Sequence, residues 1–379
     1  MPVENPPILG LGFMIAVGTT HSLFLDSLGN AWGAGSNISG QLGVVTSEQR
    51  ILSPIQIALP KSIQMLASGS QHSIFLDCDG SVFSAGSNNC GELGLTQEKF
   101  SNVAVPQKLD NLPEISSISC GYAHTMLLDT SGKVWTCGKN LHNQLGHKSR
   151  KSLHKMRVVE QLPEIKKVCA GFNRSIVIDN QDNVWVFGFN GSGRIGASSK
   201  ISHCPIKLEG LPPIKAVATG WVHSLFLDFE GKVWGCGSNS VGQLLNKPKV
   251  TYNPEKLDNL PIVQEVYAGF YASMFIDIDE RVYVCGNNHR GMLGIGDFST
   301  AGVNSLYEVQ RPEIVHHAFS DSHSIFVDKS GCTWAVGSNE QGQLGLNDLV
   351  SRHTPENVLS LPHLKLPRLV SSVKSARNV

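Results

Sequence analysis

The 379-residue sequence has no long hydrophobic run and no excess of charge of either sign. No apolar stretch approaches the roughly 20 residues that a membrane-spanning helix needs, so no membrane span is expected. Lysine plus arginine number 31, as do aspartate plus glutamate, and no long basic run occurs. A protein that follows phosphate backbones needs a basic excess or stripe, so the global charge predicts no nucleic-acid partner.

Sequence signals for targeting and for covalent catalysis are also missing. The first residues have no basic region ahead of an apolar core, and the last four contain no cysteine, so neither a signal peptide nor prenylation is expected. There is no Gly-x-Ser-x-Gly elbow, no phosphate-binding loop and no His-Glu-x-x-His helix. We therefore expect no covalent chemistry, no cofactor and no metal site.

What the sequence does contain is a unit of about fifty residues repeated seven times, which is the mark of a repeat architecture. The clearest copy runs from Gly18 to Asn37 and ends in Gly40-Gln-Leu-Gly43. One aspartate recurs at Asp26, Asp77, Asp129, Asp179, Asp228, Asp277 and Asp328. A glycine recurs at Gly35, Gly86, Gly138, Gly188, Gly237, Gly286 and Gly337. An aromatic residue recurs at Trp32, Phe83, Trp135, Trp185, Trp234, Tyr283 and Trp334.

Each copy predicts β-strands. Ser22 to Leu25 is an apolar run, Asp26-x-x-Gly29 is a hairpin turn, and Ala31-Trp32 begins the returning strand. Asp182 and Glu280 replace the turn glycine in two copies, where φ > 0 is required. The central strands are apolar on both faces, as they are when each sheet packs between two neighbours in a closed ring. We expect an all-β fold, a seven-bladed β-propeller with four-stranded antiparallel blades.

Nine cysteines form no Cys-x-x-Cys pair. Cys137, Cys236 and Cys285 precede the recurring glycine in three repeats. This placement predicts small buried strand residues in a reducing intracellular compartment, cytoplasmic or nuclear, rather than a disulfide framework.

These residues resemble the regulator-of-chromosome-condensation repeat, whose marks are Gly-x-x-His-[Ser/Thr], Asp-x-x-Gly, an aromatic residue, Gly-x-Asn and Gly-Gln-Leu-Gly. The resemblance covers the chain from about Ile15 to Leu364. We expect a single propeller over residues 1–370, latched to the first blade by the C-terminal segment, and a tail over residues 371–379. Four positions depart from the pattern: Arg174 and Ala272 for histidine, Ser320 for the first glycine and Leu245 for the last glycine.

The repeated histidines predict structure rather than chemistry. They are His21, His72, His124, His223 and His323. Because each belongs to a different blade, symmetry holds them apart, and a buried imidazole bonded to nearby backbone accounts for the repetition.

The two variable residues of Gly-x-x-His predict a binding surface around one mouth of the ring. Aromatic residues fill these positions only in repeats three to six: Tyr122, Phe172, Trp221, Phe270 and Tyr271. One interpretation is that they pack on neighbouring loops as core. The other is that they form an exposed arc that contacts a protein, and for the arc as a whole we favour contact.

The resemblance implies two functions, both without covalent chemistry. One is guanine-nucleotide exchange on a small GTPase of the Ran, Rab, Rho or Rap type. Ser320-Asp321-Ser322-His323 is similar to a motif of the family's founding exchange factor, so Asp321 and His323 are the exchange candidates, with Asp321 also counted as protein-binding. The spacings leave no room for that factor's β-wedge. The other function is a non-catalytic adaptor, scaffold or inhibitor. Photoreception and chromatin binding are not expected, because clustered Gly-Trp-Arg-His motifs and a basic tail are missing.

Overall fold

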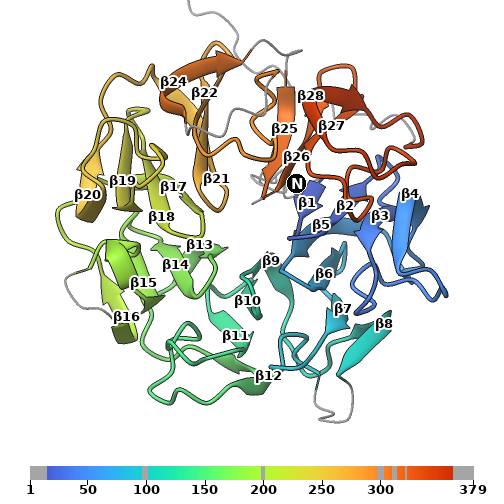
Figure 1. Ribbon diagram of the computed structural model, residues 1–379. Helices are drawn as coiled ribbons and strands as arrows, with labels where there is room; N and C mark the ends of the chain where they lie inside the picture. The colour runs from blue at the N-terminus through green and yellow to red at the C-terminus, as the bar shows by residue number, and fades with distance from the viewer. Residues whose placement is uncertain are drawn as a thin grey trace, which may run out of the picture.

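The expected ring of seven sheets is present in a computed structural model, which describes residues 15–95, 101–197, 201–296, 303–309, 314–320 and 322–361. Seven four-stranded sheets, here blades one to seven in chain order, surround a central axis (Figure 1). Each blade takes four strands that follow one another along the chain, and neighbouring strands are antiparallel. The sequence prediction of an all-β, seven-bladed propeller with four-stranded antiparallel blades is confirmed.

The strands occupy four equivalent positions from the axis outward. The innermost strands are β1 (Ile15–Val17), β5 (Ile63–Ser68), β9 (Ile115–Cys120), β13 (Ile165–Ala170), β17 (Ile214–Thr219), β21 (Val263–Ala268) and β25 (Ile314–Phe319). The second strands are β2 (His21–Leu25), β6 (His72–Asp77), β10 (His124–Asp129), β14 (Arg174–Asp179), β18 (His223–Asp228), β22 (Ala272–Asp277) and β26 (His323–Asp328). The third strands are β3 (Ala31–Ser36), β7 (Val82–Ser87), β11 (Val134–Gly138), β15 (Val184–Phe189), β19 (Val233–Ser238), β23 (Val282–Gly286) and β27 (Thr333–Gly337). The outermost strands are β4 (Arg50–Gln56), β8 (Asn102–Lys108), β12 (Leu153–Val158), β16 (Ile201–Lys207), β20 (Val250–Lys256), β24 (Val303–Val309) and β28 (Arg352–Asn357).

The repeated aspartate organises the hairpin between the second and third strands. In the first blade, Asp26 Oδ1 accepts hydrogen bonds from the amides of Leu28 and Asn30, while Trp32 Nε1 donates to Asp26 Oδ2 at 3.1 Å. The same tryptophan–aspartate bond recurs in the third, fourth, fifth and seventh blades. Asp182 and Glu280 adopt φ of 66° and 64°, so the expected left-handed turn forms without glycine. These aspartates and tryptophans are therefore structural.

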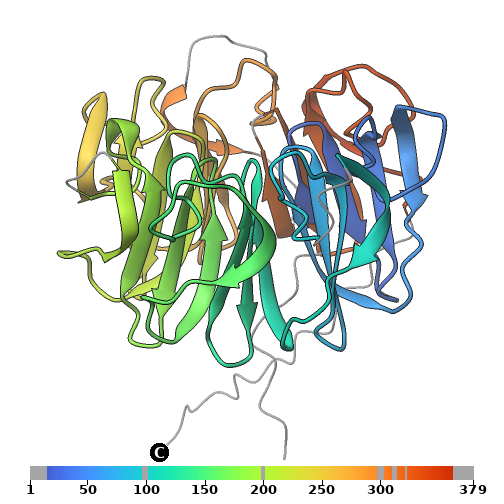
Figure 2. The same cartoon turned by 90° about the horizontal axis from the view of Figure 1, so that it is seen from below.

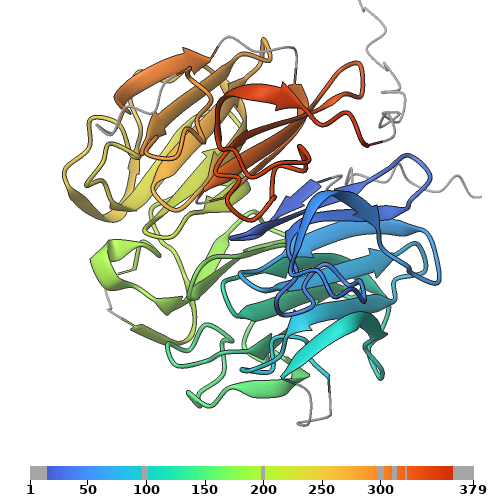
Figure 3. The same ribbon diagram turned by 45° about the vertical axis from the view of Figure 1, so that its right-hand side comes forward.

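The core lies between blades, and it also closes the ring. Ile15 and Phe24 of blade one pack in one buried cluster with Ile325 and Val327 of blade seven. The first and last blades lie side by side in the side view and the tilted view (Figures 2 and 3). Leu361 packs against the same cluster. The expected C-terminal latch beyond that residue, and the tail over residues 371–379, lie outside the described part of the chain.

The predicted burial of the repeat cysteines is confirmed. Cys137, Cys236 and Cys285 are buried, and none of the nine cysteines, all of which lie in the described ranges, forms a disulfide. Within the described ranges, no helix is long and apolar enough to cross a membrane.

Candidate functional site

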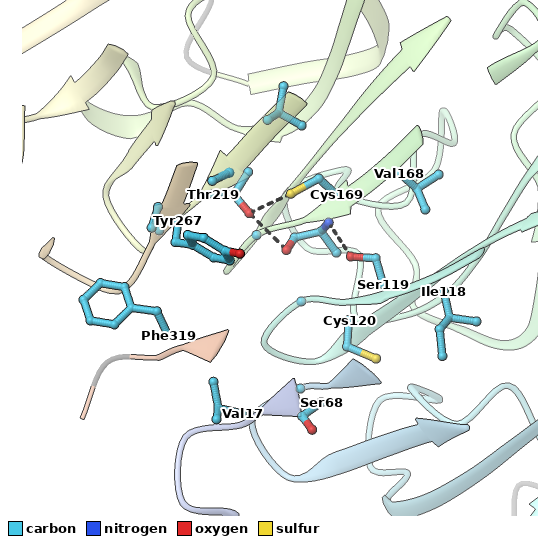
Figure 4. Close-up of a pocket in the computed structure, with 18 of the residues that line it drawn as sticks. Val17, Ser68, Ile118, Ser119, Cys120, Val168, Cys169, Thr219, Tyr267 and Phe319 are labelled. Atoms are coloured by element: carbon cyan, nitrogen blue, oxygen red, sulfur yellow. Dashed lines mark hydrogen bonds between the residues drawn. The ribbon is translucent and has the colours of Figure 1, made fainter. Parts of the chain in front are cut away.

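The innermost strands line a central cavity of about 830 Å³. Its wall is mostly small and polar on one side: Ser119 Oγ accepts a hydrogen bond from the amide of Ala170, and Thr219 Oγ1 donates to the Ala170 carbonyl (Figure 4). Cys169 Sγ lies 3.4 Å from Thr219 Oγ1, and Tyr267 adds an aromatic wall. These contacts bridge neighbouring blades, so the wall is held rigidly.

The Gly-x-x-His loops surround one mouth of this cavity. They lie at the end of each blade where the second strand begins and the third strand ends, since His21 pairs with Gly35. The loops are joined around the ring: the Ser70 amide donates to the Tyr122 carbonyl at 3.0 Å, the Tyr122 amide to the Phe172 carbonyl, and the Trp221 amide to the Phe270 carbonyl. The first variable residues of neighbouring blades are therefore direct neighbours on one rim.

Five aromatic residues on this rim form one continuous group, the aromatic cluster of Tyr122, Phe172, Trp221, Phe270 and Tyr271. The ring centroids of Tyr122 and Phe172 are 4.4 Å apart, and those of Phe172 and Trp221 are 4.9 Å apart. Trp221 lies 4.8 Å from Phe270 and 5.3 Å from Tyr271. Tyr122, Phe172 and Phe270 also line the cavity.

Burial shows how the two interpretations of these aromatics combine. Tyr122 is 39% exposed, and the other four members are partly buried. Each ring packs on its neighbours, as core residues do, and each keeps part of its surface accessible to solvent. An apolar patch of this kind, built from several blades, has the composition of a protein-contact hot spot.

The motif histidines hold neighbouring blades together. His21 Nε2 lies 3.0 Å from Ser73 Oγ in blade two, and Ser73 Oγ donates to the Gln41 carbonyl back in blade one. Because the hydroxyl proton goes to the carbonyl, the imidazole Nε2–H is the donor to the hydroxyl. We call this hydrogen bond from a motif histidine to a hydroxyl of the next blade the clasp. It also joins His72 to Thr125, His124 to Ser175, His223 to Ser273 and His323 to Ser22. The expectation that each buried imidazole bonds to nearby backbone is thus wrong, because the partner is a side-chain hydroxyl in the next blade.

Burial sets the protonation state of the clasp. It lowers the pKa of His21 to about 4 and the pKa of His72, His124, His223 and His323 to about 3. Nδ1 of His21, His124 and His223 has no hydrogen-bond partner among the described residues, so a second ring proton would be unsatisfied there. The imidazoles are therefore neutral and structural.

Blade four replaces the clasp histidine with a buried arginine. Arg174 Nε donates to Ser224 Oγ at 3.2 Å, and its terminal nitrogens donate to the carbonyls of Trp221, Gly220 and His223. Burial, together with the charge of Arg194, lowers the pKa of Arg174 to about 9. Arg194 Nη1 also donates to the Trp221 carbonyl at 3.0 Å, so two arginines hold the backbone of the central aromatic residue.

Of the two exchange candidates of repeat seven, the structure describes only His323. His323 is fully buried, with Nε2 2.7 Å from Ser22 Oγ and Nδ1 3.0 Å from Ser320 Oγ. It forms the clasp that closes the ring, and its side chain has no surface with which to touch a partner. Asp321 lies outside the described residues.

The structure adds residues that the motif-based reading missed. Arg194 lies 4.8 Å over the ring of Phe189, whose ring is 4.7 Å from that of His142. His142 and Arg194 belong to the loops after the third strand, the latter in place of the glutamine of Gly-Gln-Leu-Gly. This replacement of the motif glutamine by arginine is the sequence signal that could have identified Arg194 as a candidate site residue. No group of three or more metal-ligating side chains occurs within the described ranges.

Comparison with known proteins places this geometry among related chains. Residues 81–377 match the RCC1-like domain, and residues 29–76 and 65–92 match the regulator of chromosome condensation (RCC1) repeat. The chain is 36% identical over 149 residues to human "Probable E3 ubiquitin-protein ligase HERC3", covering 38% of this chain and 14% of that protein. It is 34% identical over 131 residues to mouse "Protein RCC2", covering 34% of this chain and 25% of that protein. The chain thus matches only a small part of the length of these relatives.

Two solved structures share the fold. Human WBSCR16 has a TM-score of 0.78 at 21% identity, covering 86% of this chain and 94% of that chain. Yeast RCC1 (Prp20), solved bound to Kap60, has a TM-score of 0.76 at 24% identity, covering 88% of this chain and 82% of that chain.

Proposed function

The chain belongs to the RCC1-like domain family, and from that premise we propose that it is a protein-binding propeller whose partner docks on the rim of blades three to six. The observation that carries the proposal is the aromatic cluster, which gathers five partly exposed aromatic side chains from four blades at one mouth. Aromatic side chains supply large contact areas at protein interfaces. The loops that carry them are bonded to one another, so little ordering is required on binding.

The finer proposal is that the partner is a small GTPase of the Ran, Rab, Rho or Rap type and that docking accelerates nucleotide release. Exchange requires no covalent step. A protein that binds the nucleotide-free GTPase more tightly than the nucleotide-bound form lowers the affinity of the GTPase for its nucleotide by the same factor. Support comes from the family membership and from yeast Prp20p, a fold neighbour described with its binding properties to Gsp1p and histones. A non-catalytic adaptor would use the same surface without changing release.

A panel of purified GTPases from these four classes, preloaded with fluorescent nucleotide, tests both the docking on the rim and the acceleration of nucleotide release. Binding is measured by surface plasmon resonance, and nucleotide release by the fluorescence decay. Trp221→Ala is expected to weaken binding at least about tenfold, since a truncated hot-spot aromatic costs about 2 kcal/mol or more. The matched control is Phe229→Ala, because Phe229 is 60% exposed in the Asp-x-x-Gly turn at the opposite end of blade five.

Each outcome decides between the alternatives. Accelerated release that Trp221→Ala abolishes and Phe229→Ala preserves supports exchange through the rim. Tight binding with unchanged release supports the adaptor. Binding that survives Trp221→Ala contradicts the aromatic rim as the docking site, and no binding across the panel contradicts a GTPase partner.

A further inference from the structure

The described parts of the loops on the aromatic side of the rim carry charge of one sign. The loops after the third strand lie at the same end of each blade as the Gly-x-x-His loops, because the third strand ends where the second begins. In blades three to six the described parts of these loops are residues 139–152, 190–197, 239–249 and 287–296. They contain no aspartate or glutamate, and their lysines and arginines are Lys139, Lys148, Arg150, Lys151, Arg194, Lys247, Lys249 and Arg290.

The described parts of the same loops in blades seven, one and two lack cations. Their described parts, residues 338–351, 37–49 and 88–95, contain no lysine or arginine. Their acidic residues are Glu340, Asp348, Glu48 and Glu92. Asp348 pairs with Arg352, and Glu92 is buried and accepts hydrogen bonds from Ser87 and the Cys90 amide. The described rim is therefore divided between a cationic, aromatic half and a weakly charged half with small side chains.

Three of the cations lie on the neighbouring loops of blades three and four. Arg194 lies 4.8 Å over the ring of Phe189, whose ring centroid is 4.7 Å from that of His142, and Lys139 and Arg150 belong to the same loop as His142. Burial, and after it the charges of Lys139, Arg150 and Arg194, lower the pKa of His142. We call these three residues the cation cluster. Through Arg194, which donates to the Trp221 carbonyl, the cation cluster is continuous with the aromatic cluster.

The cation cluster has no acidic partner of its own. Among the described residues, none of its three members forms an ion pair, whereas Lys247 further out pairs with Glu255 and Asp258. Arg150 is exposed and Lys139 is half-buried, so both present charge to solvent. Like charges held together repel one another, and this repulsion is relieved when an anion binds.

We propose that the cation cluster, with the adjacent aromatic cluster, receives an acidic segment of the protein partner that carries an apolar anchor side chain. This inference rests on the proposed function and names the chemistry of its partner. Carboxylates of the segment pair with Lys139 and Arg150, while the buried Arg194, which donates to the carbonyls of Gly191 and Trp221, adds its positive charge behind them. The anchor packs on the aromatic rings beside these cations. The described loops of blades seven, one and two offer no such cations, so the segment is held at the loops of blades three and four.

Fluorescein-labelled peptides of twelve residues test the proposal by fluorescence anisotropy. The acidic peptide contains ten glutamate or aspartate residues and two leucines; its matched versions replace every acidic residue by glutamine or by lysine. We expect only the acidic peptide to bind, with an affinity that falls as salt rises from 50 to 300 mM. Arg150→Glu is expected to weaken binding at least about tenfold, and Lys139→Glu by a similar factor, because each replaces an attraction with a repulsion.

The control variant is Lys133→Glu, which makes the same charge change at an exposed residue of the Asp-x-x-Gly turn on the opposite face. It is expected to leave binding within about twofold, as for charges beyond the screening length. Equal loss in Lys133→Glu and Arg150→Glu, or equal binding of the acidic and lysine peptides, overturns the proposal. A single-stranded twelve-nucleotide DNA that binds more tightly than the acidic peptide overturns the assignment to a protein segment.

Failure of this inference is distinguishable from failure of the proposed function. If a GTPase partner from the panel loses affinity in Trp221→Ala but not in Arg150→Glu, the aromatic docking site stands and the acidic segment is wrong. If neither variant affects the partner, the docking site itself is wrong.

Discussion

Blades three to six and blades seven, one and two share one scaffold and differ in what they present at the rim. In both halves the loops start from a glycine, except at Ser320 in blade seven, and most are joined to the next blade by a hydrogen bond to a serine or threonine hydroxyl. One half presents aromatic rings and cations, while the other presents small side chains such as Thr19 and Ser70. The difference teaches that agreement with the repeat builds the ring, and that departures from it distinguish one part of the ring from another.

The two halves also differ in how their blades are held. The clasps that lead from blades seven, one, two and three to the next blade are all histidine clasps. Blade four uses Arg174 instead of histidine. Blade six has Ala272 at this position and therefore no clasp to Ser324 of blade seven, whose hydroxyl donates to the Met292 carbonyl. Acid should therefore open the polar half of the ring first.

The largest expected effect is acid unfolding. An unfolded histidine takes up a proton near pH 6.5, whereas the five clasp histidines have pKa values of about 3 to 4 in the folded chain. The unfolded chain binds more protons between these values, so stability is complete above pH 6.5 and falls as pH drops toward 4. Together the five groups remove on the order of 10 kcal/mol, which is comparable to the whole stability of a typical domain. Circular dichroism should show cooperative unfolding before pH 4.

One variant and one local probe sharpen this prediction. His72→Gln should reduce the slope of unfolding free energy against pH by about one proton between pH 5 and 6. Hydrogen exchange at pH 5.5, corrected for intrinsic rates, should show β1, β2, β5 and β6 losing protection before β17 and β18. Uniform loss around the ring would contradict the division into two halves.

A smaller effect is expected at the arginine that replaces the histidine in blade four. Arg174→Ala removes the donor to the Gly220 carbonyl and to the Ser224 hydroxyl, removes one of two donors to the carbonyls of Trp221 and His223, and leaves a cavity, which together should cost about 3 to 5 kcal/mol. Arg174→His restores the clasp to Ser224 and should cost less, about 1 to 2 kcal/mol. Urea unfolding measures both; an alanine variant as stable as the histidine variant would show that the buried guanidinium contributes nothing.

The fold could be predicted almost entirely from the sequence, because the repeat expresses local physics in every copy. Asp26 and Trp32 are six residues apart, and the turn that joins them is specified by their neighbours alone. The same reasoning anticipated the left-handed turns at Asp182 and Glu280.

The site could be predicted only in part, because its contacts join residues far apart in the sequence. The five aromatic residues follow from the repeat register, but their mutual packing depends on the radius of the ring. The clasp joins His21 to a serine 52 residues later, so neither residue alone indicates its partner. The cation cluster takes Lys139, Arg150 and Arg194 from two different loops, and a sequence of zero net charge without a basic run gives no sign of it.

The most direct test of the account places one photo-crosslinking amino acid, benzoylphenylalanine, at the same loop position in each half of the rim, replacing Trp221 in one variant and Thr19 in the other. After irradiation in cells that contain the partner, the yield of covalent adduct to a second protein is measured by mass spectrometry. The account predicts adducts from position 221 and few or none from position 19. Equal yields from both positions, or adducts from position 19 alone, would contradict it.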